Sequence, residues 1–221
     1  MKQVADGVWH LDTFFLPNSI NAYLIEDVLV DAGTRHSGGK ILKQIGSRKV
    51  SAHALTHSHP DHQGATHEVC STLDVPLWVG ERDVQSAETG EFAQSKHPLN
   101  TLIANLWGGP GHPVARRLQE GDEVAGFQVL DVPGHSPGHV AYWRESDGVL
   151  ILGDVMNGMN LLTTIPGLHE PPNAFTPDPA RNRESIRRVA ELRPSLICFG
   201  HGPPLRNAAD KLARFADQLP A

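Results

Sequence analysis

Five histidines and two aspartates supply the residue types from which a metal centre could be built. In chain order they are His57, His59, Asp61, His62, His135, Asp154 and His201. The first four lie within the seven-residue run 56–62, a composition that no helix or strand needs for packing. Imidazole and carboxylate groups suit zinc, iron or manganese. Such a cluster, followed by isolated ligands in loop-like contexts, is typical of a two-metal hydrolytic site.

The spacing inside the run would allow it to serve two ions. His57 and His59 lie two residues apart at the expected end of a strand, where alternate side chains point the same way. Pro60 can begin the following helix, because it lacks the N–H that a first helical turn leaves unbonded. Asp61 and His62 then lie in that first turn, within reach of a second ion.

The remaining three candidate ligands follow predicted strands. Asp154 ends an apolar strand and is the best candidate for a bridging ligand, because each carboxylate oxygen can hold one ion. His135 follows Pro133-Gly134, and His201 lies between two glycines. Glycine lets the backbone turn tightly at both places.

The elements that must position these residues form two mixed halves. Alternating or apolar runs predict strands at 7–11, 20–26, 28–30, 50–55, 75–79, 124–132, 140–143, 149–152 and 195–199. Helical spacing predicts helices over 38–45, 61–73, 180–192 and 208–219. Two packed sheets with helices outside are therefore expected.

Two segments, 81–118 and 155–179, break this pattern. Long irregular connections in a compact domain are often lids or substrate-binding loops, and a disordered insertion is the alternative. Phe92, Leu106 and Trp107 are candidates for a hydrophobic substrate wall or for a small core beneath a loop.

Composition limits the class of protein. The chain has 221 residues, 39% hydrophobic and 20% charged, with a formal net charge of −6, which argues against a large nucleic-acid surface. It shows neither a signal peptide nor an apolar run long enough for a membrane helix. Cys70 and Cys198 are expected to be buried thiols. We expect a cytoplasmic protein with a small-molecule substrate and neither nucleic acid nor membrane as partner; a homodimer stays open.

The ligand order resembles that of the metallo-β-lactamase-fold hydrolases. The run H-x-H-x-D-H at 57–62 carries the resemblance, supported by Leu-Val-Asp-Ala-Gly at 29–33, Pro-Gly-His-Ser-Pro-Gly-His at 133–139 and Leu-Gly-Asp at 152–154. The likeness covers nearly the whole chain. It implies a single α/β domain, 1–221, built as a four-layer αββα sandwich with a dinuclear site at its edge. It also implies a ligand set for each ion: His57, His59 and His135 for the first, Asp61, His62 and His201 for the second, and Asp154 as the bridge.

The resemblance implies hydrolysis of an ester-type bond by a metal-bound hydroxide, which Asp61 would orient. Zinc is the first expectation for the two divalent ions, with iron or manganese as alternatives, since no thiolate selects zinc. A short glyoxalase II-like thioesterase comes first, a lactonase second and a β-lactamase third; a non-catalytic metal-binding protein is the alternative from another class. The chain ends 20 residues after His201, so we expect no C-terminal helical domain of the kind with which glyoxalase II binds glutathione.

A competing motif lies at 134–138, where Gly-His-Ser-Pro-Gly fits the serine-hydrolase elbow G-x-S-x-G. Ser136, Asp154 and His201 even follow in the order of a catalytic triad. The elbow binds the oxyanion with the N–H of the residue after the serine, and here that residue is Pro137, which has none. Ser136 is therefore not expected to be the nucleophile.

The remaining histidines are expected to have structural roles. His139 either orients a ligand by hydrogen bonding or is a half-buried strand residue. His53 is expected to be a satisfied core or surface residue. The others are expected at the surface, and His169 deserves watching because it lies in the proline-rich segment near Asp154; they are His10, His36, His67, His97, His112 and His169.

Overall fold

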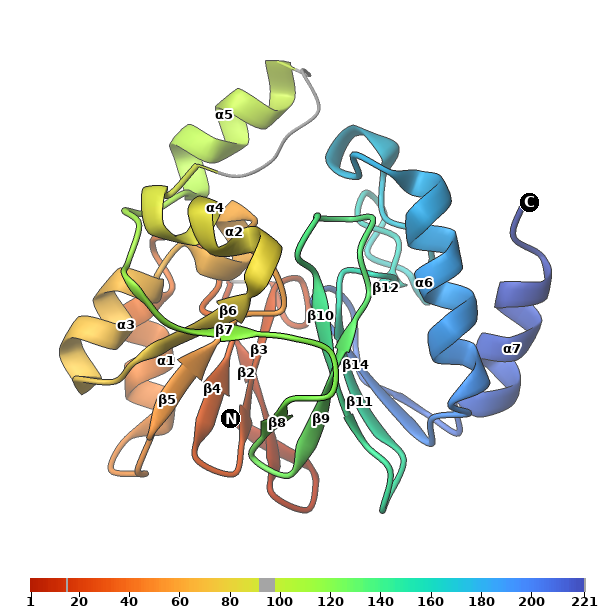
Figure 1. Ribbon diagram of the computed structural model, residues 1–221, viewed down its shortest axis with the longest axis horizontal. Coiled ribbons are helices and arrows are strands. Elements are labelled where there is room, and N and C mark those ends of the chain that lie inside the picture. The colour runs from red at the N-terminus through yellow and green to blue at the C-terminus, as the bar shows by residue number, and fades with distance from the viewer. Residues whose placement is uncertain (15, 92–97, 221) are drawn as a thin grey trace.

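The first half of the chain forms a seven-stranded sheet in a computed structural model that describes residues 1–14, 16–91 and 98–220. In chain order and in sheet order its strands are β1 (Lys2–Ala5), β2 (Val8–Asp12), β3 (Asn21–Ile25), β4 (Val28–Val30), β5 (Ala52–Ala54), β6 (Leu77–Gly80) and β7 (Val114–Leu118). The pairs from β1 to β4 are antiparallel, and those from β4 to β7 are parallel. Helices α1 (Gly38–Ile45) and α3 (Thr66–Leu73) cover the outer face of this sheet (Figure 1).

The second half forms a six-stranded sheet that packs against the first (Figure 1). Its strands, in sheet order, are β15 (Leu205–Arg206), β14 (Leu196–Phe199), β11 (Val149–Gly153), β10 (Val140–Arg144), β9 (Phe127–Asp131) and β8 (Glu123–Val124). Only β11 and β14 pair in parallel. Helices α6 (Pro179–Glu191) and α7 (Ala209–Asp217) cover its outer face, and β12 (Asn157–Met159) pairs with β13 (Pro166–His169) in a separate ribbon.

Alternation along the strands builds the layers. In β4, Val28 and Val30 face the core between the sheets, whereas Leu29 faces α1 and α3. In β11, Val149 and Ile151 face the same central core, whereas Leu150 faces α6 and α7. Strands covered on both faces bury both sets of side chains, which explains their continuous apolar runs. The predicted four-layer αββα sandwich is confirmed.

The loops that carry the candidate ligands meet at one edge of the sandwich, the upper edge in Figure 1, beside α2 (Pro60–Gln63), α4 (Val84–Thr89) and α5 (Pro98–Trp107). Strands β5, β11 and β14 all run toward this edge. Ligands in open α/β sheets generally bind at the carboxyl ends of strands. Among the described residues, no helix is long and apolar enough to span a membrane.

The predicted helix over 61–73 is wrong, because the chain forms two helices, α2 and α3, with a break after Gln63. The backbone of residues 33–35 crosses at this point, and Gly64 N–H donates to the carbonyl of Gly33. A Cβ at Gly64 would lie 2.4 Å from the nitrogen of Arg35. Close backbone approach, which no local pattern shows, therefore sets the break.

Both irregular segments contain regular secondary structure. Segment 81–118 holds a 3-10 turn (Glu81–Asp83), α4, α5 and strand β7. Segment 155–179 holds the β12–β13 ribbon and a second 3-10 turn (Asn173–Phe175). Phe92 and His97 lie outside the described residues. Strands β1, β7 and β15 were not expected from the sequence.

Candidate metal centre

The histidine run leaves β5 in extended form and enters α2 at Pro60, the first residue of that helix. The ring centroids of His57 and His59 are 4.6 Å apart. The ring of His135, from the loop between β9 and β10, lies 4.8 Å from His57 and 4.5 Å from His59. All three rings are buried. The extended backbone thus brings two imidazoles to the same point, and the second sheet supplies a third.

All seven candidate ligands come together in the structure. Their ligand atoms form three overlapping groups, each with its atoms within 4.8 Å of one another: His57, His59 and His135; His57, His62 and Asp154; and Asp61, His62 and His201. The first and third groups contain the two ligand sets that the resemblance implies. The assignment of each set to an ion stays a prediction.

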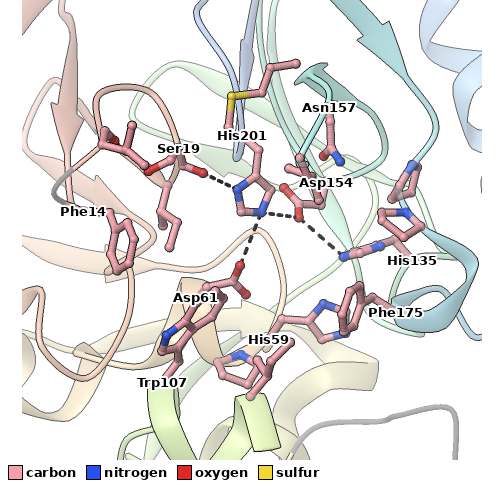
Figure 2. Close-up of a pocket in the computed structure, with 18 of the residues that line it drawn as sticks. Phe14, Ser19, His59, Asp61, Trp107, His135, Asp154, Asn157, Phe175 and His201 are labelled. Atoms are coloured by element: carbon pink, nitrogen blue, oxygen red, sulfur yellow. Dashed lines mark hydrogen bonds and ion pairs between the residues drawn. The ribbon is translucent and has the colours of Figure 1, made fainter. Parts of the chain in front are cut away.

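Asp154, which follows β11, lies between the groups (Figure 2). Its Oδ2 atom is 2.9 Å from Nε2 of His201, 3.5 Å from Nε2 of His62 and 3.6 Å from Nε2 of His135. Asp61 Oδ2 lies 3.3 Å from Nε2 of His201. One carboxylate therefore contacts members of both sets, which is the position a bridging ligand requires.

Two threonine hydroxyls determine which nitrogen of their histidine carries the proton. The Thr56 hydroxyl donates to Asp31, so it can only accept from Nδ1–H of His57, 3.1 Å away. The Thr176 hydroxyl donates to a backbone carbonyl and in the same way accepts from Nδ1–H of His135, at 3.2 Å. In both rings the lone pair is left on Nε2, the atom that faces the cluster.

His62 and His201 are oriented by acceptors. Nδ1–H of His62 donates to Asp31 Oδ2 at 2.9 Å, and Nδ1–H of His201 donates to the carbonyl of Ser19 (Figure 2). A partner on Nδ1 that directs Nε2 toward a metal is the usual arrangement around metal-binding histidines.

Several buried polar atoms at the centre lack hydrogen-bond partners: Nε2 of His57, His62 and His135, and Oδ1 of Asp154. Unsatisfied buried groups of this kind are costly in a folded protein. Cations bound among these lone pairs would satisfy them, and nitrogen and oxygen donors fit zinc, iron or manganese. The residues present therefore fit divalent metal ions.

The charges differ between the two ends of the cluster. Burial, reinforced by neighbouring imidazoles, lowers the pKa values of His57 and His135, so these rings stay neutral. Burial disfavours charge on His201 too, but Asp154 and Asp61 outweigh it and raise its pKa to about 10. Burial opposes the ionised form of Asp61, but His201 and His62 lower its pKa to about 2. The carboxylates thus draw positive charge to this end, whether a proton or a metal ion.

We expect two divalent ions per chain in protein purified without chelator, because two donor sets converge here. Elemental analysis measures the ratio. His57→Ala, which removes a donor from the first set, is expected to lower the ratio toward one, whereas His36→Ala, at an exposed position, leaves it unchanged. A ratio of one or less in the wild type after reconstitution would contradict the dinuclear assignment.

Asp31 and Asp83 hold the cluster in place, and no role was predicted for either. The Asp31 carboxylate accepts from the N–H and hydroxyl of Thr56, each at 2.8 Å, as well as from His62. In the sequence, only its place in the motif at 29–33, which supports the resemblance, pointed to a role for Asp31. No sequence motif pointed to a role for Asp83, which lies at the end of the first 3-10 turn.

Asp83 links the loops that carry His59 and His135 by hydrogen bonds. Its buried carboxylate accepts from the N–H of Ser58 at 3.1 Å, the hydroxyl of Ser136 at 2.7 Å and the N–H of Gly138 at 2.7 Å. The hydroxyl of Ser136 is therefore engaged in a structural contact with a carboxylate.

Ser136→Ala is expected to retain most of the activity, because the Ser136 hydroxyl only helps to hold two loops together. The loss of one hydrogen bond costs about 1 kcal/mol of stability. Steady-state kinetics and thermal unfolding measure the two effects. A Ser136→Ala protein that binds both ions and yet is inactive would restore the serine mechanism.

His139 and His53 are buried, with defined partners. Nε2 of His139 accepts from the N–H of Asp154 at 3.1 Å, and its ring stacks on His57 at 4.6 Å. Burial lowers the pKa of His139 to about 3, which keeps that nitrogen free to accept. His53 contacts the Leu29 carbonyl and the Thr66 hydroxyl, both at 3.0 Å. His139 thus positions the backbone of a candidate ligand, and His53 is a satisfied core residue.

The predicted surface position of His10 is wrong, because it is buried against Asn21, with Nε2 2.7 Å from Oδ1. His36 and His67 are exposed, and His112 and His169 are partly exposed. His169 does not line the pocket described next.

A pocket of about 310 Å³ opens over the cluster (Figure 2). Its walls come from the β2–β3 connection, α5 and segment 155–179. Most of the residues that line it are apolar, namely Phe14, Leu16, Ile20, Pro60, Ile103, Trp107, Met159, Leu161, Pro171, Pro172 and Phe175. Trp107 thus lines the pocket, whereas Leu106 does not and is 53% exposed.

Comparison with known proteins agrees with this fold and site. Residues 16–201 match the family described as the metallo-beta-lactamase superfamily. The chain therefore belongs to this superfamily, and this membership, with the similarity to metallo-hydrolases, supports a hydrolase.

A probable metallo-hydrolase of Bacillus subtilis, YflN, is 31% identical over 216 residues, covering 87% of this chain and 82% of that protein. A hydroxyacylglutathione hydrolase of Bdellovibrio bacteriovorus is 27% identical over 178 residues, which cover 78% of this chain and 56% of that protein. The crystal structure of TTHA1623 in a di-iron-bound form matches with a TM-score of 0.68 and 30% identity, over 89% of this chain and 94% of that one. The BLEG-1 B3 metallo-beta-lactamase, at 22% identity and a TM-score of 0.71 over 92% of this chain and 95% of that one, shows the fold alone.

Proposed function

We propose that the chain is a metal-dependent hydrolase of ester-type bonds in small, uncharged substrates with an apolar acyl group. The pocket carries this proposal, because apolar side chains surround the ligand cluster and no Lys or Arg is among the described residues that line it. A substrate carboxylate held against these walls, away from the ligand cluster, would lack a cationic side chain to pair with, which is costly. Thioesters of uncharged thiols come first and lactones second. Glutathione thioesters and β-lactam acids, which carry carboxylates, fit less well.

The seven clustered residues would hold two divalent ions, His57, His59 and His135 one and Asp61, His62 and His201 the other, with Asp154 shared. Such ions supply Lewis-acid polarisation of the carbonyl and activation of water. Zinc is the first proposal, and the di-iron form of TTHA1623 supports iron as the alternative.

The chain's own groups orient the reactants. Asp61 lines the pocket and stays ionised, so it can accept a hydrogen bond from the attacking water and orient it. The apolar walls exclude other water, which strengthens electrostatic contacts inside.

The lack of a proton donor for the leaving group favours a thioester over an oxygen ester as the substrate. Outside the ligand cluster, none of the described lining residues titrates near neutral pH, so no proton donor is available there. A thiolate leaves without protonation more readily than an alkoxide, because thiols are stronger acids. Lactones stay as the second class because their neutral, apolar acyl chains suit the same walls.

We also propose a cytoplasmic location and a small-molecule substrate. Buried Cys70 and Cys198, both free thiols, support the location, since a reducing compartment maintains thiols.

A substrate panel on metal-loaded protein tests the proposed function. It compares kcat/KM for an acyl thioester of an uncharged thiol, the same acyl thioester of glutathione, an aliphatic lactone and a β-lactam acid. We expect the uncharged thioester to give the highest value. Turnover restricted to the glutathione thioester or the β-lactam would contradict the proposal, as would no turnover of any ester.

Trp107→Ala is expected to raise KM for acyl thioesters about tenfold and to change kcat less, because it removes apolar wall without removing a candidate ligand. Leu106→Ala, the exposed neighbour on the same helix, is the matched control and should keep wild-type kinetics. Metal content should not change in either variant. Equal KM values for the two variants would show that α5 does not form part of the substrate site.

A further inference from the structure

A second pocket, of about 520 Å³, lies across β12 from the pocket over the ligand cluster. Asn157 and Met159 line the pocket over the ligand cluster, whereas Gly158, the residue between them, lines the second pocket. Neighbouring residues of a strand face opposite ways, so the two pockets share β12 as a wall. A Cβ at Gly158 would lie 2.5 Å from Cδ2 of Phe199, so the strand rests directly on this side chain of the second pocket.

Apolar side chains form most of the second pocket. They come from β13, from the end of β14 and from the residues that follow it, and Phe215 of α7 adds to them: Pro166, Leu168, Phe199, Pro203, Pro204 and Leu205. Pockets of this size with mostly apolar walls and a few polar groups are usual for small-molecule sites. The walls therefore suit an aliphatic chain.

Helix α7 supplies the polar edge of the second pocket. Lys211 and Arg214 are the only charged residues among the described residues that line it, and no Asp or Glu is among them. Together with Phe215 and Gln218 they occupy positions i, i+3, i+4 and i+7 of the helix. Residues at this spacing lie on one face, so two cations, an amide and an aromatic ring border the pocket in one stripe.

The two cations have no carboxylate partner. Neither Lys211 nor Arg214 forms an ion pair with another described residue, although Asp210 lies next to Lys211 and pairs instead with Arg193. By contrast, four arginines on α6 or just after it each pair with a carboxylate, namely Arg181, Arg183, Arg188 and Arg193. In a chain with a net charge of −6, two unpaired cations beside apolar walls are complementary to an anion that carries an apolar chain.

We propose that the second pocket binds an aliphatic carboxylate, with the head group at Lys211 and Arg214 and the chain along the apolar walls. The choice of head group rests on the proposed function, because a thioester with an apolar acyl group and water give such an acid and a thiol. This acid would form on the opposite side of β12. The guanidinium of Arg214 offers parallel N–H donors that match the two oxygens of a carboxylate.

Methyl NMR of the zinc-loaded protein tests the proposal, because it reports on each pocket separately. Leu168 and Leu205 line the second pocket, and Ile20 and Ile103 line the pocket over the ligand cluster. We expect octanoate to shift the Leu168 and Leu205 signals in a saturable manner. Octanol, without the charge, and acetate, without the chain, should each bind there about tenfold more weakly or worse. Octanoate shifts confined to Ile20 and Ile103 would overturn the proposal.

A double variant tests the head-group contacts. Lys211→Gln with Arg214→Gln should weaken octanoate binding at the second pocket by about tenfold, since two charge-assisted contacts at an exposed edge are lost. The signals of the pocket over the ligand cluster serve as the internal reference and should respond as in the wild type. Lys43→Gln with Lys49→Gln removes two exposed cations elsewhere and is the matched control, with wild-type affinity expected. Equal affinities of the two double variants would contradict the proposal.

The binding measurement needs no turnover. Octanoate bound at the second pocket of a protein that hydrolyses no thioester would therefore support this site and refute only the proposed function. Thioester hydrolysis without octanoate binding at the second pocket would do the reverse.

Discussion

Replacement of Asp154 by alanine should lower kcat/KM by roughly a thousandfold or more, as the loss of a central charged group in an active site does. The carboxylate lies within 3.6 Å of three imidazole nitrogens from both ligand sets. Without it, the second set keeps Asp61 as its only anion, and metal affinity should fall. Kinetics and elemental analysis measure these effects, while circular dichroism should show a folded protein.

Asp154→Asn is the matched control for shape. An amide of the same size keeps one oxygen but loses the charge and the second oxygen, so it should also lose most of the activity. Normal turnover by Asp154→Ala with two ions bound would exclude a role for this carboxylate in the site.

Asp31→Ala should destabilise the protein by about 3–5 kcal/mol, the usual result of removing one partner from a buried charged network. The Asp31 carboxylate accepts from the N–H and hydroxyl of Thr56 and from Nδ1–H of His62, and alanine would leave all three donors buried and unpaired. Urea unfolding of the metal-free protein gives the free energy of unfolding. Because His62 would also lose its orientation, metal affinity should decrease as well.

Asp31 has a φ of 62°, so part of the loss in Asp31→Ala comes from backbone strain, about 1 kcal/mol. Asp31→Asn separates the two effects, since asparagine tolerates this conformation and keeps one acceptor oxygen. It should be less destabilising than alanine. Asp217→Ala, exposed at the end of α7, should change stability little. Equal stability of Asp31→Ala and Asp217→Ala would remove Asp31 from any structural role.

Local patterns in the sequence predicted those elements whose cause is local. Helix α1 begins and ends at the predicted residues, and Gly46 follows it with a φ of 61°. The two-residue alternation in β4 and β11 separates central from outer core without reference to any partner. The candidate ligands could be recognised in the sequence because histidines and aspartates in this order and spacing serve no packing purpose.

The tertiary structure alone decided which distant groups meet. Asp83 and Ser136 are 53 residues apart, and only the packing of the two sheets brings them within 2.7 Å. His10 is buried because its ring packs beside Tyr23 and contacts Asn21, both on the paired strand β3, and the break after α2 exists because another backbone segment crosses at Gly64. Propensity and periodicity describe a residue's near neighbours in the chain. Partners of buried polar groups, and the walls of a pocket drawn from three segments, depend instead on contacts that form only when the layers pack.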